Sequence, residues 1–370
     1  MLQTELTIPC RIGQNPTSGT LSIARRKAIY ALCVEYDIII IEDDPYWYLQ
    51  YPSSLTTPPP RVKPPKSSGF PFLDSLIPSY LSIDYQGRVV RLDTFSKTIA
   101  PGCRLGWITA QPPLIERILR IAETSTQQPS SFVQSMVAEL IMGPSNSNDP
   151  GRGGAGDGSG WKVDGWVRWL EGLRGNYERR MNAMCDILSD GKFVLSAKPQ
   201  PRESKPIIDT LEDWDIVDKS QMYDFVRPRG GMFIWIRFNF ESHPLAKKIS
   251  PSKLAKVFWV HLTKKPYLVL AAPGDLFAPT AEIKEKDAFH YFRLCFAACP
   301  DEEVEDISRR FVDGCRSFWA GDASTNFQIS RFVMRLEDKK AKKGEDANIL
   351  TLEDLGQFDG DAWVTKLRTA

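Results

Sequence analysis

Ile38-Ile-Ile-Ile-Glu-Asp-Asp-Pro-Tyr-Trp-Tyr-Leu-Gln50 is the stretch that decides the fold of this chain. Its four consecutive isoleucines form a continuous β-branched run, which is typical of a strand buried on both faces of a parallel sheet. Two carboxylates, Asp43 and Asp44, follow this strand directly. Because ligands of open α/β sheets bind beyond the carboxyl ends of the strands, the stretch predicts a strand that leads into a binding loop.

The segments around this strand indicate an α/β fold. Residues 22–36 repeat apolar side chains at helical spacing, and Thr20 or Ser22 can cap the first turn. Further strands are expected at 88–94 and 106–110, and further helices at 114–122 and 132–142. Helices that alternate with buried strands predict a mostly parallel sheet with helices on its faces.

A second strand end carries a lysine. The run Arg91-Leu-Asp-Thr-Phe-Ser-Lys-Thr-Ile-Ala-Pro-Gly-Cys-Arg-Leu-Gly-Trp107 places Lys97 between two hydroxyls and an arginine. A lysine amine can form a Schiff base with a carbonyl cofactor. Hydroxyls such as Thr94 and Ser96, and a guanidinium such as that of Arg104, bind phosphate oxygens. The run therefore predicts a site for pyridoxal 5'-phosphate (PLP).

Three separate motifs, Asn15-Pro-Thr17, Glu42-Asp-Asp-Pro-Tyr46 and Ser96-Lys97 with Arg104, occur in an order that resembles fold-type I PLP-dependent aminotransferases of class I/II. The likeness is strongest to fungal aromatic-amino-acid aminotransferases and to kynurenine/2-aminoadipate aminotransferases. It extends from about residue 8 to about residue 310. The resemblance implies a large domain with a mostly parallel sheet and a smaller α+β C-terminal domain.

The resemblance also implies roles for single residues. Asp43 would face the pyridine nitrogen of PLP, because a protonated nitrogen makes PLP an electron sink. Lys97 would carry the Schiff base and then act as the general base. The other implied cofactor contacts are Tyr46 and Asn15 at the ring oxygen, and Thr94, Ser96 and Arg104 at the phosphate. By itself, Asp43 could equally cap the loop after its strand, and Ser18 before Gly19 departs from the family's turn by one inserted residue.

Substrate contacts are expected in both halves of the chain. The resemblance assigns the substrate α-carboxylate to Arg293, with Asn15 also near the substrate, because a guanidinium fork matches a planar carboxylate. An ordinary strand arginine paired with an acid is the alternative reading of Arg293. Trp47, Tyr48 and Phe277 are candidates to line the side-chain pocket, although core packing is at least as good an explanation for them.

Four regions are expected along the chain. Residues 1–160 are what remains of the PLP-binding large domain, with a Gly- and Ser-rich flexible insertion at 143–160. Residues 161–190 form a connecting helix, 191–328 a small domain, and 329–370 a charged tail. In the small domain we expect strands at 231–236, 267–273 and 291–296, and a helix at 301–318. The G-x-G-x-x-G run at 151–156 follows no apolar strand, so low complexity explains it better than dinucleotide binding.

The family's segment upstream of the Asn-Pro-Thr motif is not found before residue 8. That segment supplies an aromatic side chain over the PLP ring and a helix N-terminus for the phosphate. We therefore expect the N-terminal part of the family's domain to be absent, with an unpaired sheet edge as a consequence. A catalytically inactive fragment is then the alternative to an active enzyme.

Composition narrows the function classes. The chain has 370 residues with 47 basic and 46 acidic side chains, so its net charge of +1 predicts no nucleic-acid partner. Its apolar runs are too short to span a bilayer. Seven scattered cysteines suit reduced thiols in a cytoplasmic protein, and Cys295 and Cys299 lack the neighbours that a metal site needs.

These observations predict an aminotransferase. The amino group would pass from an aromatic amino acid to a 2-oxo acid such as 2-oxoglutarate, with PLP as cofactor and no metal, in a homodimer. Kynurenine or 2-aminoadipate is the alternative amino donor, and a PLP-dependent lyase is a further reading.

Overall fold

The computed structural model describes residues 5–9, 12–52, 67–142, 162–197 and 217–320, together with 329 and 333. The chain divides into two compact units, the first of residues 1–182 and 227–234 and the second of residues 183–226 and 235–370. The expected insertion at 143–160, its glycine-rich run and nearly all of the expected tail lie outside the described residues. The domain boundaries that the sequence predicts stay predictions.

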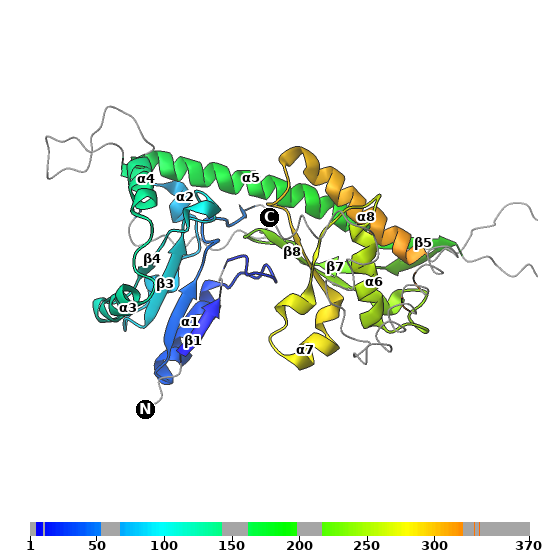
Figure 1. The fold of residues 1–370 in the computed structure, drawn as a ribbon, viewed down its shortest axis with the longest axis horizontal. Helices are drawn as coiled ribbons and strands as arrows, with labels where there is room; N and C mark the ends of the chain where they lie inside the picture. The colour runs from blue at the N-terminus through cyan, green and yellow to red at the C-terminus, as the bar shows by residue number, and fades with distance from the viewer. Residues whose placement is uncertain are drawn as a thin grey trace, which may run out of the picture. The chain divides into compact units, whose positions relative to one another are not determined.

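A four-stranded sheet organises the first unit, in the order β1-β2-β3-β4 (Figure 1). Its strands are β1 (Glu5–Pro9), β2 (Ile39–Asp43), β3 (Val89–Thr94) and β4 (Gly106–Thr109). The pairs β1–β2 and β2–β3 are parallel, whereas β4 runs antiparallel to β3. The mostly parallel sheet and the three predicted strands are confirmed, and β1 is an additional strand that the sequence pattern did not reveal.

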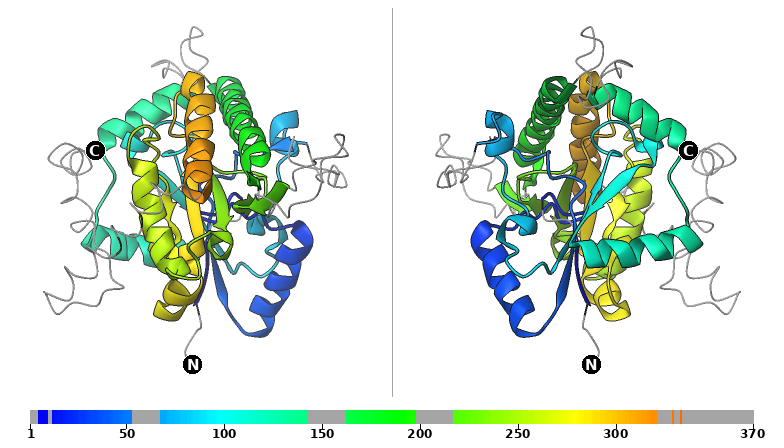
Figure 2. Two further views of the ribbon diagram at one scale, coloured as in Figure 1. Left: turned by 90° about the vertical axis from the view of Figure 1, so that its right-hand side faces the viewer. Right: turned by 90° about the vertical axis from the view of Figure 1, so that its left-hand side faces the viewer.

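Helix α1 (Ile23–Glu35) covers one face of this sheet, as the two side views show (Figure 2). Ser22 caps it, since its hydroxyl accepts a hydrogen bond from the Arg25 amide at 3.3 Å. Its buried Tyr30 and Cys33 pack against Ile40 of β2 and Val89 of β3. The predicted helix at 22–36 is thus confirmed, and burying its apolar face against the strands stabilises the layer.

Among the described residues, four more helices belong wholly or partly to the first unit. They are the short α2 (Pro71–Asp74), α3 (Pro112–Thr124), α4 (Ser131–Met142) and the 30-residue α5 (Lys162–Gly191), whose last residues enter the second unit. A 3-10 helix, η2 (Tyr80–Ile83), connects α2 to β3. The helices expected at 114–122 and 132–142 are confirmed, and α5 corresponds to the helix expected at 161–190. Among the described residues, no helix combines the length and apolarity needed to cross a membrane.

The second unit carries a sheet in the order β7-β8-β10-β9 and an antiparallel ribbon of β5 (Phe193–Ala197) and β6 (Val217–Gln221). The sheet consists of β7 (Tyr223–Phe225), β8 (Phe233–Phe238), β9 (Ala272–Pro273) and β10 (Tyr291–Cys295). Its helices are α6 (Pro251–Thr263), α7 (Ala281–Lys286) and α8 (Val304–Ala320). Aromatic rings fill the core, where Phe238 contacts Phe258, Phe292 and Phe311.

One predicted strand is wrong. Of residues 267–273, only Ala272 and Pro273 form a strand, β9. The preceding residues form a turn, in which the Lys264 carbonyl accepts hydrogen bonds from the Tyr267 and Leu268 amides and Leu268 has a φ of 51°. Within the run only Val269 and Ala271 are buried, whereas Leu268 and Leu270 are exposed, and the Val269 amide donates to the Leu262 carbonyl instead of to a neighbouring strand.

Candidate active site

Lys97 lies in a tight turn at the carboxyl end of β3. The Phe95 carbonyl accepts hydrogen bonds from the amides of Thr98, Ile99 and Ala100 at 3.2, 2.8 and 3.2 Å. The indole of Trp169 on α5 donates to the Thr98 carbonyl at 2.6 Å. The turn is therefore held from within and from α5, and it presents Lys97 as a half-buried side chain at the strand end.

Three of the predicted phosphate ligands converge beside Lys97. The Thr94 hydroxyl lies 2.9 Å from the Ser96 hydroxyl, and it also accepts the Ser96 amide at 3.1 Å. Arg104 Nη1 reaches the Ser96 hydroxyl at 3.4 Å, from a residue with left-handed backbone, φ 44°. Two hydroxyls, an amide and a guanidinium form a donor set that fits a phosphate group.

Asp43 ends β2, on the strand next to Lys97. Burial raises the pKa of its carboxyl group, and the nearby charge of Asp93 raises it further. The parallel register sets Asp43 opposite Leu92, so Thr94, two residues further along β3, lies on the same face of the sheet as Asp43. An anionic side chain and the phosphate-type donors thus share one face at one edge, which fits a cofactor with a basic ring nitrogen and a phosphate.

The Asn15 turn is built against residues 230–233 of the same unit. Asn15 and Pro16 are joined by a cis peptide bond, and the Asn15 side chain is exposed. Tyr46 is buried, with its ring edge-on to Phe233 at 6.0 Å between centroids. The inserted Ser18 is buried as well, and its hydroxyl donates to the Phe233 carbonyl. The departure from the family's turn is therefore accommodated by a specific contact.

Two glycines allow this close approach. Gly13 and Gly231 both have left-handed backbone, with φ of 56° and 82°. A Cβ atom on Gly13 would lie 2.3 Å from the Gly231 Cα, and one on Gly231 would lie 2.6 Å from the Gly13 carbonyl oxygen. Only glycine fits either position. The sequence analysis did not single out either residue.

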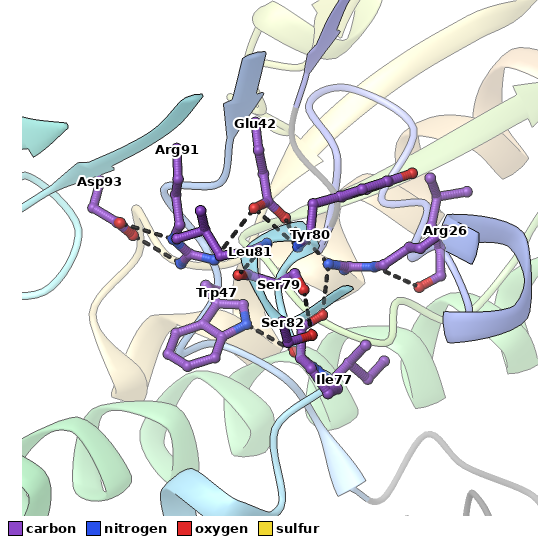
Figure 3. A network of polar contacts seen from close by, with 12 residues as sticks. Arg26, Glu42, Trp47, Ile77, Ser79, Tyr80, Leu81, Ser82, Arg91 and Asp93 are labelled. Carbon is purple, nitrogen blue, oxygen red and sulfur yellow. Dashed lines mark hydrogen bonds and ion pairs between the residues drawn. The ribbon is translucent and has the colours of Figure 1, made fainter. Parts of the chain in front are cut away.

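Behind the site lies a network of buried charges that the sequence analysis missed (Figure 3). Arg26 Nη1 donates a hydrogen bond to the Glu42 carboxylate at 3.3 Å. The Tyr80 amide donates to both oxygens of the same carboxylate at 3.1 Å. Arg91 Nη1 lies 3.6 Å from the same carboxylate. The sequence Ile-Ile-Glu-Asp-Asp indicates carboxylates on a buried strand. The partner of Glu42, however, is Arg26 of helix α1, and arginines in helices are ordinarily exposed.

Asp44 belongs to the same buried region. Among the described residues, neither of its carboxylate oxygens has a hydrogen-bond partner of good geometry, although the Ile12 amide is near enough to act on its charge. Burial raises the pKa of Asp44 to about 7, although the charges of Arg26 and Arg91 oppose that rise. Because side chains alternate along a strand, Glu42 and Asp44 point away from the face that carries Asp43. Asp44 is therefore a buried acid of the network and not a second ligand on the Asp43 face.

The candidate pocket residues Trp47 and Tyr48 take part in packing. Trp47 Nε1 donates to the Ile77 carbonyl at 2.8 Å, and both rings pack against a cluster of Phe72, Leu76, Val167 and Leu170. In the second unit, Arg293 on β10 is half-buried, and its guanidinium lies over the Phe277 ring at 4.8 Å. Its predicted contact with a substrate carboxylate stays a prediction.

Within the described ranges, no group of three or more His, Cys, Asp or Glu side chains has the arrangement of a metal site. Cys299 Sγ instead contacts the Cys295 carbonyl at 3.9 Å.

Comparisons with known proteins identify relatives of this chain. Residues 13–164 match the family model of aminotransferase class I and II. The aromatic amino acid aminotransferase C1773.13 of Schizosaccharomyces pombe is 33% identical over 310 residues, which are 83% of this chain and 53% of that protein. The L-tyrosine:2-oxoglutarate aminotransferase amt1 of Serpula lacrymans is 37% identical over 248 residues, 66% of this chain and 39% of that protein.

The solved structure of aminotransferase Aro8 from Candida albicans superimposes with a TM-score of 0.62 at 32% identity, over 85% of this chain and 57% of that one. The chain thus spans about half the length of the curated relatives it matches. The sequence match and the shared architecture confirm the predicted α/β fold of the fold-type I PLP-dependent transferases. Taken together, they show that this chain belongs to the family of class I and II aminotransferases.

Proposed function

We propose that this chain takes part in PLP-dependent transfer of the amino group from an aromatic amino acid to a 2-oxo acid such as 2-oxoglutarate. The observation that carries the proposal is the convergence of Thr94, Ser96 and Arg104 beside Lys97, on the sheet face that also carries Asp43. Relatives named for aromatic and tyrosine donors support the choice of substrate class.

When bound, PLP supplies an electron sink that stabilises negative charge at the α-carbon of an amino acid. The protein's own groups then have separate tasks. The Lys97 amine extends from a turn whose main chain is held by the Phe95 carbonyl and Trp169, and it removes and returns the proton at the substrate α-carbon. Thr94, Ser96 and Arg104 would bind the phosphate, and the Asp43 carboxylate would accept a hydrogen bond from the protonated ring nitrogen.

The remaining roles follow from the residue types. Asn15 and Tyr46 donate hydrogen bonds to the ring oxygen, and Arg293 binds the α-carboxylate of the substrate through its guanidinium fork. For the whole protein we further propose a homodimer in the cytoplasm, as the family resemblance implies.

A donor screen tests this function. The purified chain is incubated with PLP, 2-oxoglutarate and one donor at a time (tyrosine, phenylalanine, tryptophan, kynurenine or 2-aminoadipate), and glutamate is quantified by mass spectrometry. We expect the highest kcat/KM with an aromatic donor. Lys97→Ala should abolish glutamate formation and Lys97→Arg should not restore it, whereas Lys192→Ala, which removes a surface partner of Asp224, should leave it unchanged. Turnover that survives Lys97→Ala would contradict the proposal.

A further inference from the structure

One face of the four-stranded sheet in the second unit carries an arginine among aromatic rings. Tyr291 and Arg293 of β10 are half-buried and alternate with core residues, so both side chains point away from the core. The neighbouring strand β8 places Trp235 on the same face, because its ring stacks on that of Tyr291 at 5.2 Å between centroids and an interplanar angle of 9°. Arg293 therefore extends from the face that bears these two rings.

A third ring, that of Phe277, comes from a different segment. It ends the 3-10 helix η5 (Gly274–Phe277), which follows β9, and β9 pairs with β10. Gly274 at the start of η5 is buried, and a Cβ atom added to it would lie 2.2 Å from the Ala288 carbonyl oxygen. Because η5 packs this closely on the segment just before β10, the position of Phe277 beside the sheet is well defined.

The Phe277 ring contacts both Trp235 and Arg293. It is edge-on to the Trp235 ring, at 5.8 Å between centroids and an interplanar angle of 85°. The guanidinium carbon of Arg293 lies over the Phe277 ring, 4.8 Å from its centroid. The quadrupole of an aromatic ring attracts a cation over its face. This attraction occupies none of the guanidinium N–H groups, so the ring can hold Arg293 and leave its donors to an anion.

We propose that Phe277 is a positioning residue that acts through Arg293, because its ring orients the guanidinium that binds the α-carboxylate of the substrate. This inference rests on the proposed function, in which Arg293 makes that contact. An arginine side chain has several rotatable bonds, and ordering them costs free energy. A guanidinium that is already held over a ring loses less of this freedom when the carboxylate binds. Phe277 then has a task other than lining a pocket for the substrate side chain.

The test compares the binding of two ligands that differ only at the carboxyl group. One is hydrocinnamate, which is phenylalanine without its amino group, and the other is hydrocinnamamide, its uncharged amide. Dissociation constants of both are measured by isothermal titration calorimetry on the full chain with saturating PLP, so no turnover is needed. The quantity of interest is the acid preference, the dissociation constant of the amide divided by that of the acid.

We expect the wild-type chain to prefer the acid and Phe277→Leu to lower that preference roughly three- to tenfold. Phe277→Tyr, which keeps the ring face, should retain most of it. In an Arg293→Leu chain, adding Phe277→Leu should cause no further loss, because Phe277 acts through Arg293. Phe289→Leu is the matched control, since Phe289 is a half-buried ring of the same unit that packs on His290 at 4.1 Å between centroids. It should leave the preference unchanged. Circular dichroism and thermal unfolding check that each variant is folded.

Different results overturn the inference and the proposed function. A folded Phe277→Leu chain with the full acid preference, an equal loss in Phe289→Leu, or the same loss with and without Arg293 removes the role of Phe277 while that of Arg293 stands. If Phe277→Leu does not fold, Phe277→pentafluorophenylalanine replaces it, because that ring keeps a similar shape but no longer attracts a cation, and a full preference there overturns the role equally. A wild-type chain without an acid preference, or with one that survives Arg293→Leu, contradicts the proposed function of Arg293 and the inference with it.

Discussion

The hydroxyl of Ser18 donates a hydrogen bond to the main-chain carbonyl of Phe233, 215 residues further along the chain. Ser18 is 7% exposed and has left-handed backbone, φ 59°. Its amide also donates to the Gln14 carbonyl at 2.6 Å. The residue that breaks the family's turn pattern therefore fixes the Asn15 turn to the start of β8.

Because Gly13 and Gly231 approach each other closely, adding a single methyl group at Gly231 should lower the stability of the fold strongly. Gly231→Ala must accept a φ of 82° and a Cβ 2.6 Å from the Gly13 carbonyl oxygen. We expect a loss of about 2–3 kcal/mol in the free energy of unfolding, measured with urea. Gly172→Ala on α5 is the control, since nothing lies within 4 Å of its added Cβ, and it should be neutral or stabilising. Similar effects of both variants would contradict this account.

Breaking the buried Arg26–Glu42 pair should be costly. Both side chains are 0% exposed, so Arg26→Met leaves a buried carboxylate without its guanidinium. We expect a loss of about 3–5 kcal/mol in urea unfolding. The double variant Arg26→Met/Glu42→Gln should recover part of that loss, because it removes the uncompensated charge. If adding Glu42→Gln to Arg26→Met instead lowers the free energy of unfolding further, the result would count against the pairing.

Asp44 should make the chain less stable as pH rises. Its pKa is about 7 in the folded state and near its ordinary value of 3.8 in the unfolded state. Between these values the folded state binds more protons, so this group lowers the free energy of unfolding as pH increases from about 4 to 7. Asp44→Asn removes the effect.

The measurement is urea unfolding of both chains at pH 5 and pH 8. From pH 5 to pH 8, the free energy of unfolding of Asp44→Asn should rise relative to that of the wild-type chain by on the order of 2–4 kcal/mol. A constant stability difference between the two chains across the interval would show that Asp44 does not titrate as described.

His243 in the second unit should have the opposite effect. Its Nε2 bonds to the Phe318 carbonyl at 2.9 Å, its Nδ1 accepts the Leu245 amide at 3.1 Å, and burial lowers its pKa to about 4. The unfolded state binds more protons between pH 4 and 6.5, so this group's contribution to stability is lost as pH falls through that window. His243→Gln should flatten the acid side of the stability curve, by on the order of 2 kcal/mol between pH 7 and 4.5. An unchanged acid slope would contradict it.

The sheet and the Lys97 turn were predictable because their signals are local. Ile38–Ile41 is β-branched throughout, and Thr94, Ser96, Lys97 and Arg104 stand within one turn of the strand end, so spacing alone brings them together. The segment 267–271 shows the limit of this reasoning, because it is equally apolar but forms a turn, in which the Tyr267 carbonyl accepts a hydrogen bond from Arg310 of α8.

The contacts that sequence could not provide join residues that are far apart in the chain. Gly13 meets Gly231, and Arg26 meets Glu42 only once α1 lies on β2. The sequence does not distinguish a buried arginine from an exposed one, so the burial of Arg26 becomes evident only from the fold. Asp93 is a similar case, because its two-point contact with Arg91, beside Glu42, depends on the register of β2 and β3.

The central claim, that Lys97 is the cofactor lysine, has a direct test. The purified chain is mixed with PLP, reduced with borohydride, digested, and searched by mass spectrometry for the pyridoxyl-modified peptide. The account predicts a single dominant modification on Lys97, lost in Lys97→Ala and weakened in Arg104→Ala, whose guanidinium contacts Ser96. A folded chain that is labelled only at scattered surface lysines, equally with and without Lys97, would contradict it.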